Sequence, residues 1–265
     1  LACVKANFLH EQIVTKQYID QVIEEVSGLT LEQDIPFTKL EEQLNQEIIG
    51  QQDVIHHLFS SLQTLFQYPN IHQPKAVYLF LGSSGVGKTQ SAKLLAKMLK
   101  RHFIRLDMSE YSDATSVNKI IGSPAGYVGY DDRTSLLHEM VLYPHSILLL
   151  DEIEKAHSHV KHLFLQVFDE GYLKDNHQHH ISFKDTIIIM TSNATKQNEF
   201  FVGFKKQKFH YKDLEDYFSV EFLNRIDEIF SFRSLGLQDY QKILQKESPV
   251  PLSDDMIKDI LQDYD

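Results

Sequence analysis

Apolar residues recur along this chain with two different spacings. Three stretches carry them at every third or fourth position, as in an amphipathic helix, and span about 15–27, 39–48 and 52–67. Short unbroken apolar runs, typical of buried parallel strands, occur at 76–81, 103–106, 146–150, 186–191 and 228–232. Helical spacing follows the first of these runs to about 100 and fills 157–169. The pattern therefore predicts strands that alternate with helices.

This alternation predicts an α/β fold, a three-layer sandwich with helices on both faces of a five-stranded parallel sheet. A polar stretch at about 28–37 is expected to be a linker, and helical spacing from about 236 onward suggests a small second unit. We therefore expect three parts. They are the end of a preceding segment with its linker at 1–37, a large α/β domain at 38–235 and a partial helical lid at 236–265.

A glycine-rich turn joins the first predicted strand to the helix after it. It consists of Gly82, Ser83, Ser84, Gly85, Val86, Gly87, Lys88 and Thr89, the pattern G-x-x-x-x-G-K-[ST]. Glycines let backbone N–H groups crowd around phosphate oxygens, and the start of the helix adds its positive end. Lys88 is expected to reach the β- and γ-phosphates, and Thr89 to offer its hydroxyl to Mg²⁺. The turn predicts a site for ATP with magnesium.

Polar groups follow the ends of two further predicted strands. Asp151 and Glu152 end the run 146–150, at the edge where ligands bind in open α/β sheets. Asp151 would hold Mg²⁺ through water, and Glu152 would orient or deprotonate the attacking water. Asn193 follows 186–191, where it would either position that water or serve as a turn asparagine. These residues predict hydrolysis of the bound nucleotide.

Arg225 stands just before the last predicted strand and has two interpretations. It could reach the γ-phosphate bound by a neighbouring subunit, as an arginine finger in trans. It could instead form a surface ion pair with Asp227 or Glu228. The local sequence does not separate the two.

Two apolar segments lie outside the predicted core. In Gly126-Tyr127-Val128-Gly129, glycines flank an aromatic and a branched side chain, which would form either a moving grip on another chain or a buried turn. The segment 200–204 includes Val202, Gly203 and Phe204. It would either form a docking loop for a partner or pack against the sheet.

Composition narrows the class of protein. The net charge of −11 disfavours a nucleic-acid surface, and the single cysteine, Cys3, excludes a disulfide framework and fits a reducing compartment. No apolar run approaches the ~20 residues of a membrane span. We expect a soluble, cytoplasmic protein that begins mid-chain. The 14 histidines, with three at 177–180, do not have zinc-site spacing, so a solvated loop is expected there.

Taken together, the motifs resemble one family. The chain is similar to the second ATPase module of the Clp unfoldases, in the AAA+ class, from about 40 to 235. The matching segments are Ile48-Ile49-Gly50-Gln51, the turn 82–89, Asp107-Met108-Ser109-Glu110-Tyr111, Gly126-Tyr127-Val128-Gly129-Tyr130, Leu150-Asp151-Glu152-Ile153-Glu154-Lys155-Ala156-His157, Met190-Thr191-Ser192-Asn193 and Phe222-Leu223-Asn224-Arg225-Ile226-Asp227-Glu228.

The resemblance implies an ATP-dependent unfoldase that works as a homo-hexameric ring on protein substrates. Asn193 would be the first sensor and Arg225 the trans finger, both serving catalysis with Glu152. Ile48 and Ile49 would line the adenine pocket, and Gln90 would complete the cofactor-binding set. Tyr127 and Val128 would drag polypeptide through the pore. Val202-Gly203-Phe204 would dock on a ClpP-type peptidase, as in the ClpC/ClpA-like branch.

The chain departs from this family in several places. The family usually has Pro-Thr at Ser83-Ser84, Gly-Gly near Arg133-Thr134, and arginines near Leu142-Tyr143 and within 176–182. Its helical lid is longer and carries a second sensor arginine. These departures leave a second hypothesis open, a non-hydrolysing, nucleotide-bound assembly or adaptor module. A third, a nucleic-acid motor, is disfavoured by the acidic charge and by the Gly-Tyr-Val-Gly segment.

Overall fold

A computed structural model describes residues 35–68, 72–122, 135–194 and 214–248. The large strands of these segments are β1 (Ala76–Leu81), β2 (His102–Asp107), β3 (Ser146–Asp151), β6 (Ile187–Ser192) and β7 (Glu228–Ser231). The main helices are α3 (Phe37–Glu47), α4 (Gln52–Gln67), α5 (Lys88–Met98), α8 (Ser158–Glu170) and α10 (Leu237–Glu247). In the part of the chain that the structure describes, no helix combines the length and apolar character that a bilayer crossing requires.

The five long strands form one parallel sheet in the order β2-β3-β6-β1-β7. Each predicted strand is present to within a residue or two of its expected bounds. Every residue of β1, β3 and β6 is buried, which explains why these strands have unbroken apolar runs in the sequence. The predicted five-stranded parallel α/β fold is confirmed.

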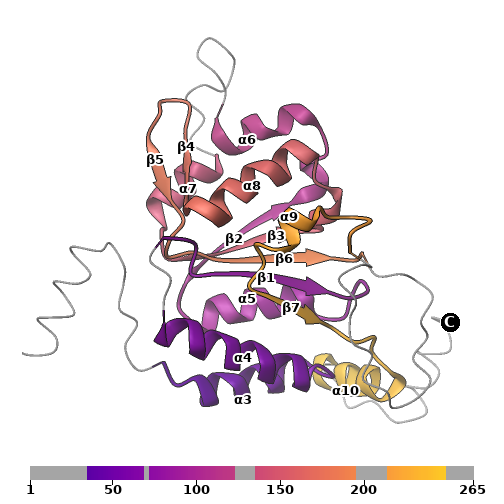
Figure 1. Ribbon diagram of the computed structural model, residues 1–265. Coiled ribbons are helices and arrows are strands. Elements are labelled where there is room, and N and C mark those ends of the chain that lie inside the picture. Colours follow the sequence, from indigo (N-terminus) through magenta and orange to yellow (C-terminus); the bar gives the residue numbers. More distant parts are fainter. Residues whose placement is uncertain (1–34, 69–71, 123–134, 195–213, 249–265) are drawn as a thin grey trace, which may run out of the picture. The chain divides into compact units, whose positions relative to one another are not determined.

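Helices cover both faces of this sheet, with α6 (Val117–Ile121), α7 (Leu136–Leu142) and α8 on one face and α3, α4 and α5 on the other (Figure 1). On the first face, alternate residues of the central strands pack with aromatic residues of α8, among them Phe164 and Phe168. On the second face, the hydroxyl of Tyr78 in β1 lies 3.0 Å from that of Ser61 in α4. The sheet is thus the middle layer of three.

A hairpin and several short helices were not predicted from the sequence. The hairpin pairs β4 (Tyr172–Lys174) with β5 (His180–Ser182), and α6, α7 and α9 (Val220–Leu223) are each at most seven residues long. The solvated loop expected around 177–180 is wrong in part, because His180 belongs to β5 and only the hairpin turn is irregular. Elements this short carry too few residues to display a period.

Of the expected helical lid the structure describes α10, which begins at Leu237 and is preceded by Gly236. Lys246 near its end donates hydrogen bonds to the backbone oxygens of Gln46 and Glu47, both at 3.1 Å. The expected domain boundaries at 37/38 and 235/236 stay predictions, as does the helix at 15–27, because 1–34 and 249–265 lie outside the described residues.

The strand order determines which loops meet. β6 lies between β1 and β3, and β2 lies on the outer side of β3. Since parallel strands end at the same edge, the segments that follow β1, β3 and β6 converge there. The glycine-rich turn, the paired carboxylates and Asn193 lie at the ends of these three strands, so the topology predicts that they form one site.

Candidate nucleotide-binding site

The glycine-rich turn between β1 and α5 has the backbone geometry that close approach to phosphates requires. Gly85 and Gly87 adopt φ values of +78° and +103°, which residues with a side chain rarely adopt. Gly87 is also the N-cap of α5, so the first N–H groups of this helix have no partner within the helix. The turn can therefore direct backbone donors and a helix N-terminus at an anion.

Lys88 folds back over this turn. Its buried ammonium group donates hydrogen bonds to the carbonyl oxygens of Gly82 and Ser83, both at 2.6 Å, and to Oδ1 of Asn193 at 2.9 Å. Burial lowers the pKa of Lys88 below its ordinary value, while three nearby acids act in the opposite direction. Lys88 and Asn193, which were predicted separately from the sequence, thus lie in direct contact.

Asp151 at the end of β3 accepts hydrogen bonds from three elements. The hydroxyl of Thr89 lies 3.1 Å from its Oδ1, and that of Thr191 in β6 lies 2.5 Å from the same atom. On the other oxygen, Nε of Arg105 in β2 lies 2.9 Å from Oδ2. The Asp151 side chain is 9% exposed, so its negative charge is compensated by contacts within the protein.

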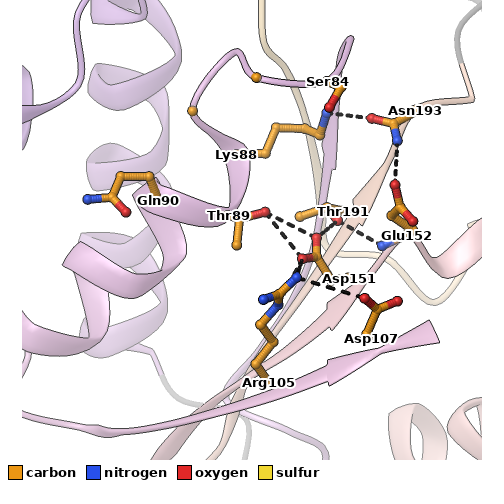
Figure 2. A pocket seen from close by; sticks show the side chains of 12 residues that line it. Ser84, Lys88, Thr89, Gln90, Arg105, Asp107, Asp151, Glu152, Thr191 and Asn193 are labelled. Carbon is orange, nitrogen blue, oxygen red and sulfur yellow. Dashed lines mark hydrogen bonds and ion pairs between the residues drawn. The ribbon is translucent and has the colours of Figure 1, made fainter. Parts of the chain in front are cut away.

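Glu152 follows in a left-handed conformation, with φ 59° and ψ 51°, which is uncommon for a residue other than glycine. Its backbone N–H donates to Oγ1 of Thr191 at 2.9 Å. Its carboxylate accepts from Nδ2 of Asn193 at 3.1 Å and pairs with Nζ of Lys155 at 2.6 Å. The hydrogen bond between Glu152 and Lys155 raises the pKa of the Lys155 ammonium group. The backbone turns the Glu152 carboxylate toward Asn193, and so toward the glycine-rich turn (Figure 2).

These groups line one open pocket of about 490 Å³. Of the residues expected at the site, Gln90 also lines the pocket, although its side chain points away from the acidic cluster (Figure 2). The lining comprises Ser84, Gly85, Gly87, Lys88, Thr89, Gln90, Arg105, Asp107, Asp151, Glu152, Thr191 and Asn193.

Three of these residues, Arg105, Asp107 and Thr191, were not assigned to the site from the sequence. Arg105 left a signal, because it is a cation among apolar residues in the predicted strand 103–106. Thr191 left none, since a threonine at the end of a strand is common. Asp107 accepts from Ser109, and these hydrogen bonds lower the pKa of its carboxyl, which is therefore ionised at neutral pH.

The segment expected beside the adenine lies against the glycine-rich turn. Ile48 is 5% exposed, and its Cγ2 would be 3.4 Å from a Cβ placed on Gly87. Ile49, the next residue, is partly buried. Gln51 is 2% exposed; its amide donates to the carbonyls of Val86 and Arg233 and accepts from the Arg233 N–H. Gln51 thereby joins the turn to the segment that leads into α10.

Gln51 is therefore expected to contribute strongly to stability. Gln51→Met keeps the length of the side chain but removes every donor and acceptor, leaving the buried carbonyl of Val86 and the partly buried backbone groups of Arg233 without their partner. We expect the free energy of unfolding, measured by urea titration, to fall by about 2–3 kcal/mol. The exposed Gln43→Met in α3 is the matched control and should change it by less than about 0.5 kcal/mol. Equal losses in both variants would contradict the bridging role.

Arg225 does not line the pocket of its own chain in the part of the chain that the structure describes. Its guanidinium pairs with Asp169 at the end of α8 and is 39% exposed. Neither expected pairing, with Asp227 or with Glu228, is formed: the Asp227 carboxylate accepts from the N–H of Val77 in β1 at 2.7 Å, and that of Glu228 lies 3.6 Å from Nε2 of His57. Burial raises the pKa of the Asp227 carboxyl. Arg225 thus occupies the molecular surface.

Some predicted sites lie outside the described residues. These are Tyr127 and Val128 of the expected pore loop, and Val202, Gly203 and Phe204 of the expected docking loop. Within the described ranges, no cluster of three or more His, Cys, Asp or Glu side chains could hold a metal ion by themselves. His179 instead pairs with Asp175 across the β4–β5 turn.

Comparison with known proteins agrees with this geometry. The family model for the AAA domain (Cdc48 subfamily) matches residues 73–229. Over 249 residues, or 87% of the chain, the sequence is 39% identical to the ATP-dependent Clp protease ATP-binding subunit ClpE of Bacillus subtilis. It is 38% identical over 258 residues, or 91% of the chain, to the chaperone protein ClpB of Prochlorococcus marinus.

The fold and the pocket define a nucleotide-binding P-loop ATPase. The chain belongs to the AAA domain family (Cdc48 subfamily), and its relatives are Clp proteins, so the predicted resemblance is confirmed. It spans 35% of the length of the ClpE relative and 30% of the ClpB relative. The shared region is therefore about a third of each relative, and the match does not by itself show the activity of a full-length protein.

Proposed function

We propose that this chain is an ATP-driven protein unfoldase and translocase module of a Clp-type ring. One observation carries the proposal: Asn193 contacts both Lys88 and Glu152, at 2.9 Å and 3.1 Å. A phosphate-binding cation, a polar sensor and an acid are thereby connected within one pocket. This arrangement supports nucleotide hydrolysis, which needs a base beyond the terminal phosphate.

The residues around Asp151 are suited to Mg²⁺. The carboxylate of Asp151 and the hydroxyl of Thr89 are hard oxygen donors, 3.1 Å apart, beside the turn that would hold the phosphates. In the proposed complex Thr89 would bind the ion directly and Asp151 through water. When bound, Mg²⁺ would neutralise charge on the phosphate oxygens. Residues from Gly82 to Gln90 would hold the triphosphate, and Ile48 and Ile49 the adenine.

Glu152 would act as general base toward the attacking water, which Asn193 would orient. In the described state the Glu152 carboxylate is shared between Asn193 and Lys155, so at least one of these contacts must loosen before the carboxylate can accept a proton. Arg225 of a neighbouring subunit would stabilise the charge that develops on the γ-phosphate. The surface position of Arg225 supports this role, because an arginine that serves another subunit must project from its own.

The remaining parts of the proposal concern the assembly. We infer a homo-hexamer in which Tyr127 and Val128 grip protein substrates, and in which Val202-Gly203-Phe204 docks on a ClpP-type peptidase. The name of the ClpE relative, an ATP-binding subunit of a protease, supports such a partner, and the name of the ClpB relative supports a chaperone. We further propose a cytoplasmic location, or an organelle compartment of bacterial descent.

The pore-loop assignment predicts a separation between threading and hydrolysis. Tyr127→Ala removes the large apolar grip and leaves the nucleotide pocket intact, so threading should be lost while ATP turnover is retained. The measurement is the loss of native fluorescence of a tagged substrate protein, alongside phosphate release. Tyr68→Ala, which truncates a tyrosine that is 77% exposed, is the control and should leave both rates unchanged. Threading that persists in Tyr127→Ala would refute the assignment.

A second candidate is a nucleotide-bound assembly or adaptor module that does not hydrolyse ATP. The engagement of Glu152 by both Asn193 and Lys155 favours it, because a carboxylate held twice is a poor base. Phosphate release in the presence and absence of an unfolded protein decides between the two candidates. Stimulated turnover supports the unfoldase, and stimulation by an added ClpP-type peptidase supports that partner. ATP binding without turnover in the full-length protein supports the adaptor.

A further inference from the structure

Arg105 makes a contact that the hydrolytic chemistry described above does not use. It lies on β2, the strand next to β3, and its register partner in β3 is two residues before Asp151. Its guanidinium places two nitrogens on one oxygen of that carboxylate, Nε at 2.9 Å and a terminal nitrogen at 2.7 Å from Oδ2. Figure 2 shows Arg105 approaching Asp151 from the side opposite Thr191.

This contact uses the carboxylate that the proposed function assigns to magnesium. Thr191 donates to Oδ1 of Asp151, Thr89 lies 3.1 Å from Oδ1 and 3.4 Å from Oδ2, and Arg105 donates through two nitrogens to Oδ2. Both oxygens of the carboxylate therefore accept hydrogen bonds before Mg²⁺ binds. A hydrated Mg²⁺ and the guanidinium would compete for Oδ2, because both need its lone pairs.

The Arg105 side chain is also exposed enough to move away from Asp151. Its side chain is 51% exposed, whereas that of Asp151 is 9% exposed. Its terminal nitrogen is already 4.0 Å from Oδ2 of Asp107, whose side chain is 40% exposed. Since hydrogen bonds from Ser109 lower the pKa of Asp107, that carboxylate is ionised and can accept the guanidinium. A short rotation of the arginine exchanges one acidic partner for another.

We propose that Arg105 is a positioning residue that neutralises Asp151 before nucleotide binds and yields it to Mg²⁺ as the metal–nucleotide complex enters. The inference rests on the proposed function. Arg105 then has two opposite effects. It lowers the repulsion between Asp151 and the phosphates when no metal is present, and it competes with the metal when Mg²⁺ is present. Arg105 thereby sets how strongly nucleotide affinity depends on magnesium.

The test is the ratio of two affinities in the full chain. Binding of a fluorescent ATP analogue is measured once with excess EDTA and once with excess Mg²⁺. In Arg105→Gln, the affinity in EDTA should fall about tenfold, because Asp151 is left without its cation. The affinity in Mg²⁺ should stay equal or rise. The ratio of the dissociation constant in EDTA to that in Mg²⁺ should therefore grow at least about tenfold. Arg105→Lys, which keeps the charge but loses the fork, should give an intermediate ratio.

Two controls separate this effect from simpler ones. Lys93→Ala removes a charge from an exposed position of α5 and should leave the ratio unchanged. Thermal unfolding followed by circular dichroism should show that Arg105→Gln is folded. If the ratio of the two dissociation constants in Arg105→Gln equals that of the parent protein, the proposal is overturned. A parallel loss of both affinities would have the same consequence, because it indicates direct contact of Arg105 with phosphate. If the parent protein itself binds no nucleotide in either condition, the proposed function fails as well.

Discussion

Glu152→Gln is expected to lower the rate of ATP hydrolysis by about 10²–10⁴-fold while ATP stays bound. Glutamine has the size of glutamate and can still accept the hydrogen bond from Asn193, so the pocket should keep its shape. It cannot accept a proton from water, and it loses the ion pair with Lys155. Phosphate release gives the rate, and binding of a fluorescent ATP analogue with Mg²⁺ gives the affinity.

The control for this variant is Glu110→Gln. Glu110 is an exposed acid in the short 3₁₀ helix Met108–Tyr111, so its replacement changes the net charge equally without touching the pocket. It should leave both quantities unchanged. An unchanged hydrolysis rate in Glu152→Gln would remove Glu152 from the role of base. A parent rate that is already negligible would favour the adaptor module instead.

Arg225→Ala is expected to lower hydrolysis by about 10³–10⁵-fold in assembled rings of the full-length protein, if Arg225 completes a neighbour's site. The competing explanation is structural, since Arg225 pairs with Asp169 in its own chain. Asp169→Asn breaks the same ion pair but keeps the arginine. A trans finger predicts near-normal turnover in Asp169→Asn, whereas a structural ion pair predicts equal losses in both variants.

Mixed rings provide the direct test of action in trans. Lys88→Ala subunits lack the phosphate-binding cation but carry Arg225, and Arg225→Ala subunits have the opposite defect. A mixture should hydrolyse ATP faster than either variant alone, because some sites then combine an intact pocket with an intact neighbour. If Arg225 instead served its own subunit, no site in the mixture would be complete and turnover would not recover.

The sequence alone determined the fold class and most of the pocket. Buried parallel strands need unbroken apolar runs, so β1, β3 and β6 were visible with their ends, and a residue at the end of such a strand lies at the ligand edge. Asp151 and Asn193 follow from this logic, whereas Lys88 follows from the pattern of the glycine-rich turn. The phosphate-binding turn was evident as well, because its glycines adopt backbone conformations that other residues rarely adopt.

The tertiary structure decided how these residues are connected. No spacing in the chain indicates that Asn193 lies between Lys88 and Glu152, that Arg105 neutralises Asp151, or that Gln51 joins the phosphate-binding turn to the segment before α10. Each contact joins residues that are distant in sequence, and the contacts of Asn193 and Arg105 depend on the order β2-β3-β6-β1 in the sheet, whereas that of Gln51 with Arg233 depends on β7 lying beside β1. Apolar periodicity records which side chains are buried, whereas the partner of a polar group depends on which strands become neighbours.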